Sequence, residues 1–98
     1  MSYEQTIQEH LRITLLRLLY EDPDYTQNDS LLTDLTEAYG FTPSRDKVRT
    51  ELAWLAEQGL VTIDDGKIII AMLTERGADV ARGRVTVPGV KRPSPGRR

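Results

Sequence analysis

Residues 48–71 read VRTELAWLAEQGLVTIDDGKIIIA, in which a helical pattern passes through a glycine into a β-hairpin pattern. Val48, Leu52 and Leu55 recur at the spacing of one helix face, which predicts a helix with an inward stripe. Gly59 suits the left-handed position after a helix end, and Leu60 can then fold back on Leu55. This segment therefore predicts a helix that ends at Gly59 and leads directly into a strand.

The hairpin pattern is centred on Asp65-Gly66, which lies between two runs rich in β-branched residues. Asp-Gly in this position is typical of a two-residue hairpin turn. The resulting register predicts four apolar residues on the buried side, with Ile63 opposite Ile68 and Val61 opposite Ile70.

A first helix is predicted at the start of the chain. Ser2 and Gln5 fit a capping box, and the helix then runs to about Tyr20 and ends before Pro23. Its inward stripe is predicted to be Ile7, Leu11, Leu15 and Leu18.

A second helix is predicted from Asn28 or Asp29 to about Tyr39. Its apolar side is predicted to be Leu31, Leu32, Leu35 and Tyr39. The third helix is expected to begin with Thr42 as its cap and Pro43 at its first position.

The order of these elements predicts an α+β fold, a winged helix-turn-helix. We expect a three-helix core, a β-hairpin wing and a short C-terminal helix that is capped by Thr74 and ends near Gly83. The core is predicted to contain Leu11, Leu15, Leu18, Leu35, Val48, Leu52, Leu55, Ile63, Ile68 and Ile70. The predicted domain spans residues 1–83, and residues 84–98 form a basic tail rich in proline and glycine that packs no core of its own.

Charge is distributed unevenly along the 98 residues, although the net charge is only −2. Residues 1–81 contain all 15 acidic residues and seven of the 13 Lys and Arg, a net charge of −8. Residues 82–98 contain the other six basic residues and no acidic one. An acidic body with a basic arm suggests that the arm contacts an anionic partner.

Catalytic and metal-binding patterns are not found in the sequence. The chain has no cysteine and a single histidine, His10, so thiolate zinc sites and cysteine nucleophiles are excluded. No glycine-rich phosphate loop is present, and no apolar run is long enough to span a membrane. We expect no enzymatic activity, no cofactor, no metal and no membrane partner.

Several segments resemble known winged-helix proteins. The passage through Gly59-Leu60-Val61 and the segment Thr74-Glu75-Arg76-Gly77 resemble the wing region of bacterial winged-helix regulators. A more specific segment is Gly83-Arg84-x-x-x-Val87-Pro88-Gly89-Val90-Lys91-Arg92-Pro93. It resembles small winged-helix (ArsR-like) proteins of Mu-like phages and prophages. The resemblance covers nearly the whole chain and implies the fold and a phage context, but the absence of cysteine departs from metal-sensing ArsR repressors.

The candidate DNA-binding residues lie at the start of the third helix, at the hairpin tip and in the tail. In a helix-turn-helix, the start of the third helix enters the major groove, where arginine pairs with guanine. The predicted contacts are Thr42, Ser44, Arg45, Arg49, Thr50, Lys67, Arg84, Lys91, Arg92, Arg97 and Arg98. The alternative is a solvated helix surface, which Asp46, Glu51 and Glu57 on the same helix favour.

The preferred function is binding of double-stranded DNA by a phage or prophage transcriptional regulator in the cytoplasm of the bacterial host. The alternative is a protein–protein interaction module, or an accessory factor of phage assembly or packaging, that docks a phage or host protein and does not bind DNA. A homodimer is predicted because Ile13, Leu16 and Tyr20 lie off the inward stripe of the first helix and add apolar surface.

Overall fold

The computed structural model describes residues 2–93, and its longest element is helix α1 (Tyr3–Glu21). The Ser2 hydroxyl caps this helix by accepting a hydrogen bond from the Gln5 amide at 3.0 Å, which satisfies a donor that the first turn leaves open. Pro23 follows the end of the helix, where it cannot continue the backbone ladder.

Caps at the other helices explain where those helices begin. The remaining elements are, in order, β1 (Thr26–Asn28), α2 (Asp29–Thr36), η1 (Glu37–Tyr39), α3 (Arg45–Glu57), β2 (Val61–Asp65), β3 (Ile69–Leu73) and α4 (Glu75–Ala81). The cap of α2 is Asn28, one of the two residues at which this helix was predicted to begin, and the cap of α4 is Thr74, as predicted. The predicted cap of α3 at Thr42 is wrong. Ser44 accepts from the Lys47 amide at 3.0 Å, so the helix starts two residues later than Pro43.

The three strands form an antiparallel sheet in the order β1-β3-β2, with β3 in the centre. The register pairs Val61 with Leu73, Ile63 with Ala71 and Asp65 with Ile69. The predicted two-residue turn is therefore wrong, because residues 66–68 form the loop. Ile63 faces Ala71 instead of Ile68, and this odd shift turns every β3 side chain to the opposite face of the sheet. As a result Ile70 is 37% exposed, and Ile68, which lies in the loop, is 51% exposed.

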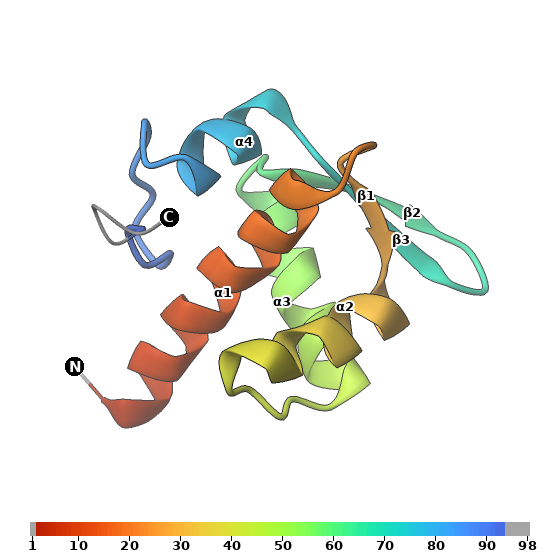
Figure 1. Cartoon of the computed structure of the whole chain (residues 1–98), viewed down its shortest axis with the longest axis horizontal. Coiled ribbons are helices and arrows are strands. Elements are labelled where there is room, and N and C mark those ends of the chain that lie inside the picture. The colour runs from red at the N-terminus through yellow and green to blue at the C-terminus, as the bar shows by residue number, and fades with distance from the viewer. Residues whose placement is uncertain (1, 94–98) are drawn as a thin grey trace.

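The hydrophobic core lies between α1, α3, α4 and the inner face of the sheet (Figure 1). Its larger fully buried side chains include Leu15, Leu16, Leu19, Leu32, Leu52, Leu55, Leu60, Val48 and Val61. The C-terminal turn of α3 has the predicted geometry: Gly59 has a φ of +77°, and the Leu60 amide donates to the Leu55 carbonyl at 3.0 Å. The predicted core position at Leu35 is wrong, since this residue is 38% exposed, and Leu18 and Ile63 are only half-buried.

Helix α1 is surrounded by its own chain, contrary to the basis of the predicted dimer surface. It packs against α2, α3, α4 and β3, with the C-terminal segment alongside (Figure 1). Ile13 is 6% exposed and Leu16 is completely buried, whereas Tyr20 is half-buried and its ring lies 5.7 Å from that of Tyr25. These side chains belong to the fold of one protomer, so they provide no free apolar surface for a partner.

Part of the segment after α4 packs against the domain, although the sequence analysis predicted that the domain ends at residue 83. Val87 and Val90 are 4% and 7% exposed and belong to the core cluster. The Lys91 amide also donates to the Glu9 carbonyl of α1 at 3.2 Å. The predicted boundary at residue 83 is therefore wrong, because the packed domain includes at least residue 91.

Candidate functional site

Two arginines at the exposed start of α3 meet one buried carboxylate of α2. Arg45 donates through Nε and Nη2 to the two carboxylate oxygens of Asp29, at 3.1 and 3.3 Å. Arg49, one turn further along α3, donates through Nε to Oδ2 of the same carboxylate. The Asp29 side chain has no exposed surface, whereas those of Arg45 and Arg49 are 45% and 35% exposed. We call these three residues the Asp29 cluster.

The charge states of the Asp29 cluster follow from its contacts. Burial acts to raise the pKa of Asp29, but the hydrogen bonds and charges of Arg45 and Arg49 outweigh burial and lower that pKa below its ordinary value. The same hydrogen bond to Asp29 raises the pKa of Arg49. Asp29 is also the first residue of α2, where the helix N-terminus favours a negative charge. These shifts stabilise the charged forms of Asp29 and Arg49.

The other predicted DNA-binding residues near this site divide into two that are exposed and two whose hydroxyl groups already form hydrogen bonds in α3. Thr42 is exposed, and Ser44 uses its hydroxyl to cap α3. The Thr50 hydroxyl donates to the Asp46 carbonyl at 3.0 Å. Lys67 is exposed in the hairpin loop. The hairpin also places a negative charge near the site, because Asp65 acts electrostatically on Arg49.

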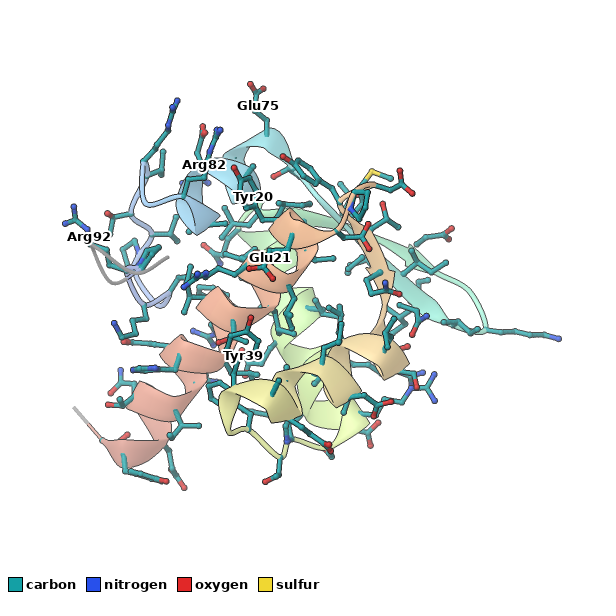
Figure 2. The ribbon with its side chains drawn as sticks, viewed as in Figure 1. Tyr20, Glu21, Tyr39, Glu75, Arg82 and Arg92 are labelled. Carbon is teal, nitrogen blue, oxygen red and sulfur yellow. The ribbon has the colours of Figure 1, made fainter. Side chains whose placement is uncertain are left out.

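The basic residues of the tail that the structure describes, Arg84, Lys91 and Arg92, lie away from the start of α3. The C-terminal segment packs beside α1 at the end of the molecule opposite the hairpin (Figure 1). Arg84 and Arg92 are exposed and Lys91 is half-buried; Arg92 projects outward from this segment (Figure 2). The predicted residues Arg97 and Arg98 lie outside the described residues. The structure therefore does not join Arg84, Lys91 and Arg92 to the Asp29 cluster in one surface.

A second buried carboxylate, Glu51, lies in the middle of α3, and sequence reasoning missed its role. Its side chain accepts from Arg12 Nε at 2.6 Å, from Lys47 Nζ at 2.9 Å and from Gln8 Nε2 at 3.0 Å. Burial acts to raise the pKa of Glu51, but these hydrogen bonds lower it overall. A signal for this role was present in the sequence: Glu51 falls on the inward stripe of Val48, Leu52 and Leu55.

Arg12 connects Glu51 to the C-terminal segment. Its guanidinium carbon lies 3.7 Å from the centroid of the Trp54 ring, and its Nη1 donates to the Gly89 carbonyl at 2.9 Å. Gly89 has a φ of +94°, and a Cβ there would lie 2.8 Å from the Trp54 ring. These four residues, Arg12, Glu51, Trp54 and Gly89, form what we call the Glu51 cluster. It joins α1, α3 and the C-terminal segment.

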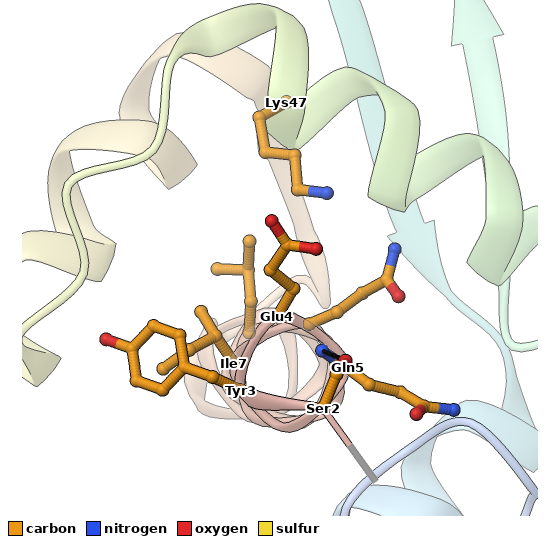
Figure 3. A pocket seen from close by; sticks show the side chains of 8 residues that line it. Ser2, Tyr3, Glu4, Gln5, Ile7 and Lys47 are labelled. Atoms are coloured by element: carbon orange, nitrogen blue, oxygen red, sulfur yellow. Dashed lines mark hydrogen bonds between the residues drawn. The ribbon is translucent and has the colours of Figure 1, made fainter.

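The surface has several open hollows. One of about 610 Å³ lies between the first turns of α1 and Lys47 of α3 (Figure 3). Another of about 610 Å³ lies beside Arg45, between Leu31 and Ile68. Within residues 2–93, no group of three or more His, Cys, Asp and Glu side chains is arranged to hold a metal ion. No helix in this part of the chain is both long and apolar enough to cross a membrane.

Comparison with known proteins identifies two relatives. The chain is 48% identical over 88 residues to protein gp26 of Escherichia phage Mu, which covers 89% of this chain and 91% of gp26. It is also 43% identical over 79 residues to a protein of Haemophilus influenzae, and this match covers 78% of this chain and 76% of the Haemophilus protein. Both are uncharacterized proteins, and the profiles of known protein families give no match. The chain belongs to the family of these two proteins, in agreement with the predicted resemblance to Mu-like phage proteins.

Proposed function

We propose that this member of the Mu gp26 family is a winged-helix phage regulator that binds double-stranded DNA with the exposed start of α3. In this proposal α2 and α3 form the helix-turn-helix, and the β2–β3 hairpin is the wing. The order of the elements and the exposure of the first turn of α3 support it.

The observation that carries the proposal is the Asp29 cluster. Within residues 2–93, Arg49 uses only Nε for its hydrogen bond to Asp29, which leaves both terminal amino groups available to a ligand. Because the carboxylate fixes the guanidinium plane, little conformational freedom remains to be lost on binding. Two parallel amino groups match the O6 and N7 acceptors of guanine in the major groove. Asp29 would thus position the arginine that reads the base.

The local charge indicates which part of DNA recognition this surface can supply. Arg45 and Arg49 are opposed by Asp29, and Asp46 and Asp65 also act on Arg49. Long-range attraction of phosphates is therefore weak here, and the contact depends on short-range hydrogen bonds. We expect a shallow dependence of duplex affinity on salt, and a clear dependence on base sequence.

Titration of the full chain against duplex fragments of its own genome at several salt concentrations tests the proposal. A subset of fragments should bind more tightly, and Arg49→Ala should reduce that preference more than it reduces the salt slope. Arg76→Ala is the matched control, because this α4 arginine is exposed and bonds only the Gln58 carbonyl within the described residues. Absence of duplex binding even at low salt would contradict the proposal.

The second candidate is a protein-interaction module, which a different observation favours. Ile68, Ile70 and Met72 are 51%, 37% and 50% exposed, and the last two lie on the outer face of the central strand. Polar residues flank this stripe, since Ile70 pairs with Asn28 and Asp64, and Met72 with Thr26 and Thr62. Exposed apolar stripes with polar rims are typical of protein contacts.

Self-association is the first test of this apolar stripe, because a homodimer was predicted on other grounds. If the stripe joins two copies, sedimentation at high micromolar concentration should give a dimer that the Ile70→Lys variant converts to a monomer. A wild-type monomer under these conditions would remove both the homodimer and this role of the stripe.

A further inference from the structure

A basic hollow of about 140 Å³ lies between α1 and the C-terminal segment. The C-terminal segment lies at the end of the molecule opposite the hairpin (Figure 1). His10 and Arg17 line it from α1, and Lys91 and Arg92 line it from the C-terminal segment. Within residues 2–93, no ion pair joins Arg17, Lys91 or Arg92 to a carboxylate. In a chain whose net charge is −2, this hollow therefore gathers cations that remain available to an anion.

An adjoining hollow of about 390 Å³ is lined by aromatic rings. It shares His10 and Tyr39 with the basic hollow, and Tyr3 and Phe41 contribute further rings. Tyr3 is 81% exposed, Tyr39 is 49% exposed and Phe41 is half-buried. Tyr3 projects to one side of α1, and it also lines the hollow beside Lys47 (Figure 3). We call the two joined hollows the α1 groove.

The aromatic residues of the chain divide into two groups. Trp54 stacks with Arg12, and Tyr20 contacts both Arg82 and Tyr25. The other three of the six aromatic residues are Tyr3, Tyr39 and Phe41. Within the described residues these three have no stacked ring or cation partner, and all three line the α1 groove.

We propose that the α1 groove binds single-stranded nucleic acid. Proteins that bind single strands combine cations that follow the phosphates with aromatic rings on which the bases stack. In the α1 groove, Arg17, Lys91 and Arg92 contact phosphates, and Tyr39, where the two hollows meet, stacks on a base. A duplex keeps its base faces stacked inside the helix and cannot use the rings, and an acidic peptide would engage the cations alone. The groove is separate from the Asp29 cluster, so this activity does not depend on the proposed duplex binding.

Fluorescence anisotropy with a labelled oligothymidine of about 10 nucleotides, a length within the usual site sizes, tests this inference on the full chain. Tyr39→Ala should weaken binding about tenfold through the loss of one stacked base, whereas Tyr39→Phe should retain the affinity of the wild type. Arg17→Gln combined with Arg92→Gln should reduce the slope of log affinity against log salt by about 0.7 for each phosphate that is no longer neutralised. Lys67→Gln removes one exposed charge from the hairpin and should change nothing.

Three results would overturn the inference. These are no binding of the oligothymidine at low salt, wild-type affinity in Tyr39→Ala, or equally tight binding of polyglutamate. Circular dichroism of the Tyr39 variants checks that the fold is retained. Arg49→Ala separates the two proposals, because it should weaken binding of duplex DNA and leave binding of the oligothymidine intact.

Discussion

Two buried carboxylates bind cations of α3, Asp29 of α2 and Glu51 of α3 itself, and they differ in the burial of the arginines beside them. The side chains of Asp29 and Glu51 are both buried, and cations lower the pKa of each. The Arg12 side chain beside Glu51 is only 10% exposed and is covered by Trp54. Arg45 and Arg49 beside Asp29 remain 45% and 35% exposed. Lys47, the second cation beside Glu51, is also 45% exposed, so the two carboxylates differ in their arginines: the Glu51 cluster holds a buried one, whereas both arginines of the Asp29 cluster can meet a ligand.

The largest effect is expected when the carboxylate of the Glu51 cluster is removed. Glu51→Ala leaves the buried charge of Arg12 without its partner, which should lower the free energy of unfolding by about 3–5 kcal/mol. Urea denaturation measures this loss. Glu57→Ala is the control, because this glutamate is exposed on the same helix and its loss should cost no more than about 0.5 kcal/mol. Equal losses in the two variants would show that the Glu51 cluster contributes nothing special to the fold.

A smaller effect is expected at the opposite side of the same cluster. Gly89→Ala strains a backbone with φ of +94° and pushes a Cβ against the Trp54 ring, whereas Gly40→Ala strains a backbone with φ of +87° in open space. Both variants should lose stability, and Gly89→Ala should lose about 1–3 kcal/mol more because of the clash. The difference in stability between the two variants, measured by thermal denaturation, gives the cost of the clash with the Trp54 ring. A Gly89→Ala variant as stable as Gly40→Ala would mean that the C-terminal segment is not held against Trp54.

The smallest change is expected in the stability of the protein at acidic pH, when the charge of Asp29 is removed. Both have pKa values in the folded state below their ordinary values of 3.8 and 4.5. The unfolded chain therefore takes up protons first as the pH falls, so the stability from these groups is complete above about pH 5 and is lost through pH 4 and below. Asp29→Asn should make the acid dependence of urea denaturation shallower, whereas Glu57→Gln should leave it unchanged. An identical acid dependence in Asp29→Asn and the wild type would show that Asp29 does not contribute.

Much of the secondary structure was predictable because it depends on local signals. The caps at Ser2, Asn28 and Thr74 and the turn at Gly59 involve contacts within a few residues, which a sequence displays directly. The hairpin register was not predictable, because apolar residues occupy both faces of the strand around Ile69, Ile70 and Met72. The burial pattern depends on whether β1 and the helices cover Ala71 and Leu73, and that is a tertiary effect.

The candidate site was predictable in its residues but not in its contacts. The exposed start of α3 is implied by helix phase, so Arg45 and Arg49 could be named from the sequence. Their shared partner Asp29 lies 16 and 20 residues earlier, and only the packing of α2 on α3 brings it beneath them. The tail was misjudged for a similar reason, because the burial of Val87 and Val90 accompanies the long-range hydrogen bond between Arg12 and Gly89.

A double-mutant cycle on duplex binding tests the central claim, that Asp29 holds its arginines for DNA, most directly. Affinity is measured for the best-bound and a poorly bound genome fragment with wild type, Asp29→Asn, Arg49→Ala and the double variant. We expect each single variant to reduce the ratio of the two affinities, Arg49→Ala by about tenfold, and the double variant to lose no more than Arg49→Ala alone. A uniform gain of affinity for both fragments in Asp29→Asn would contradict the claim, because Asp29 would then act only as an anion that competes with DNA.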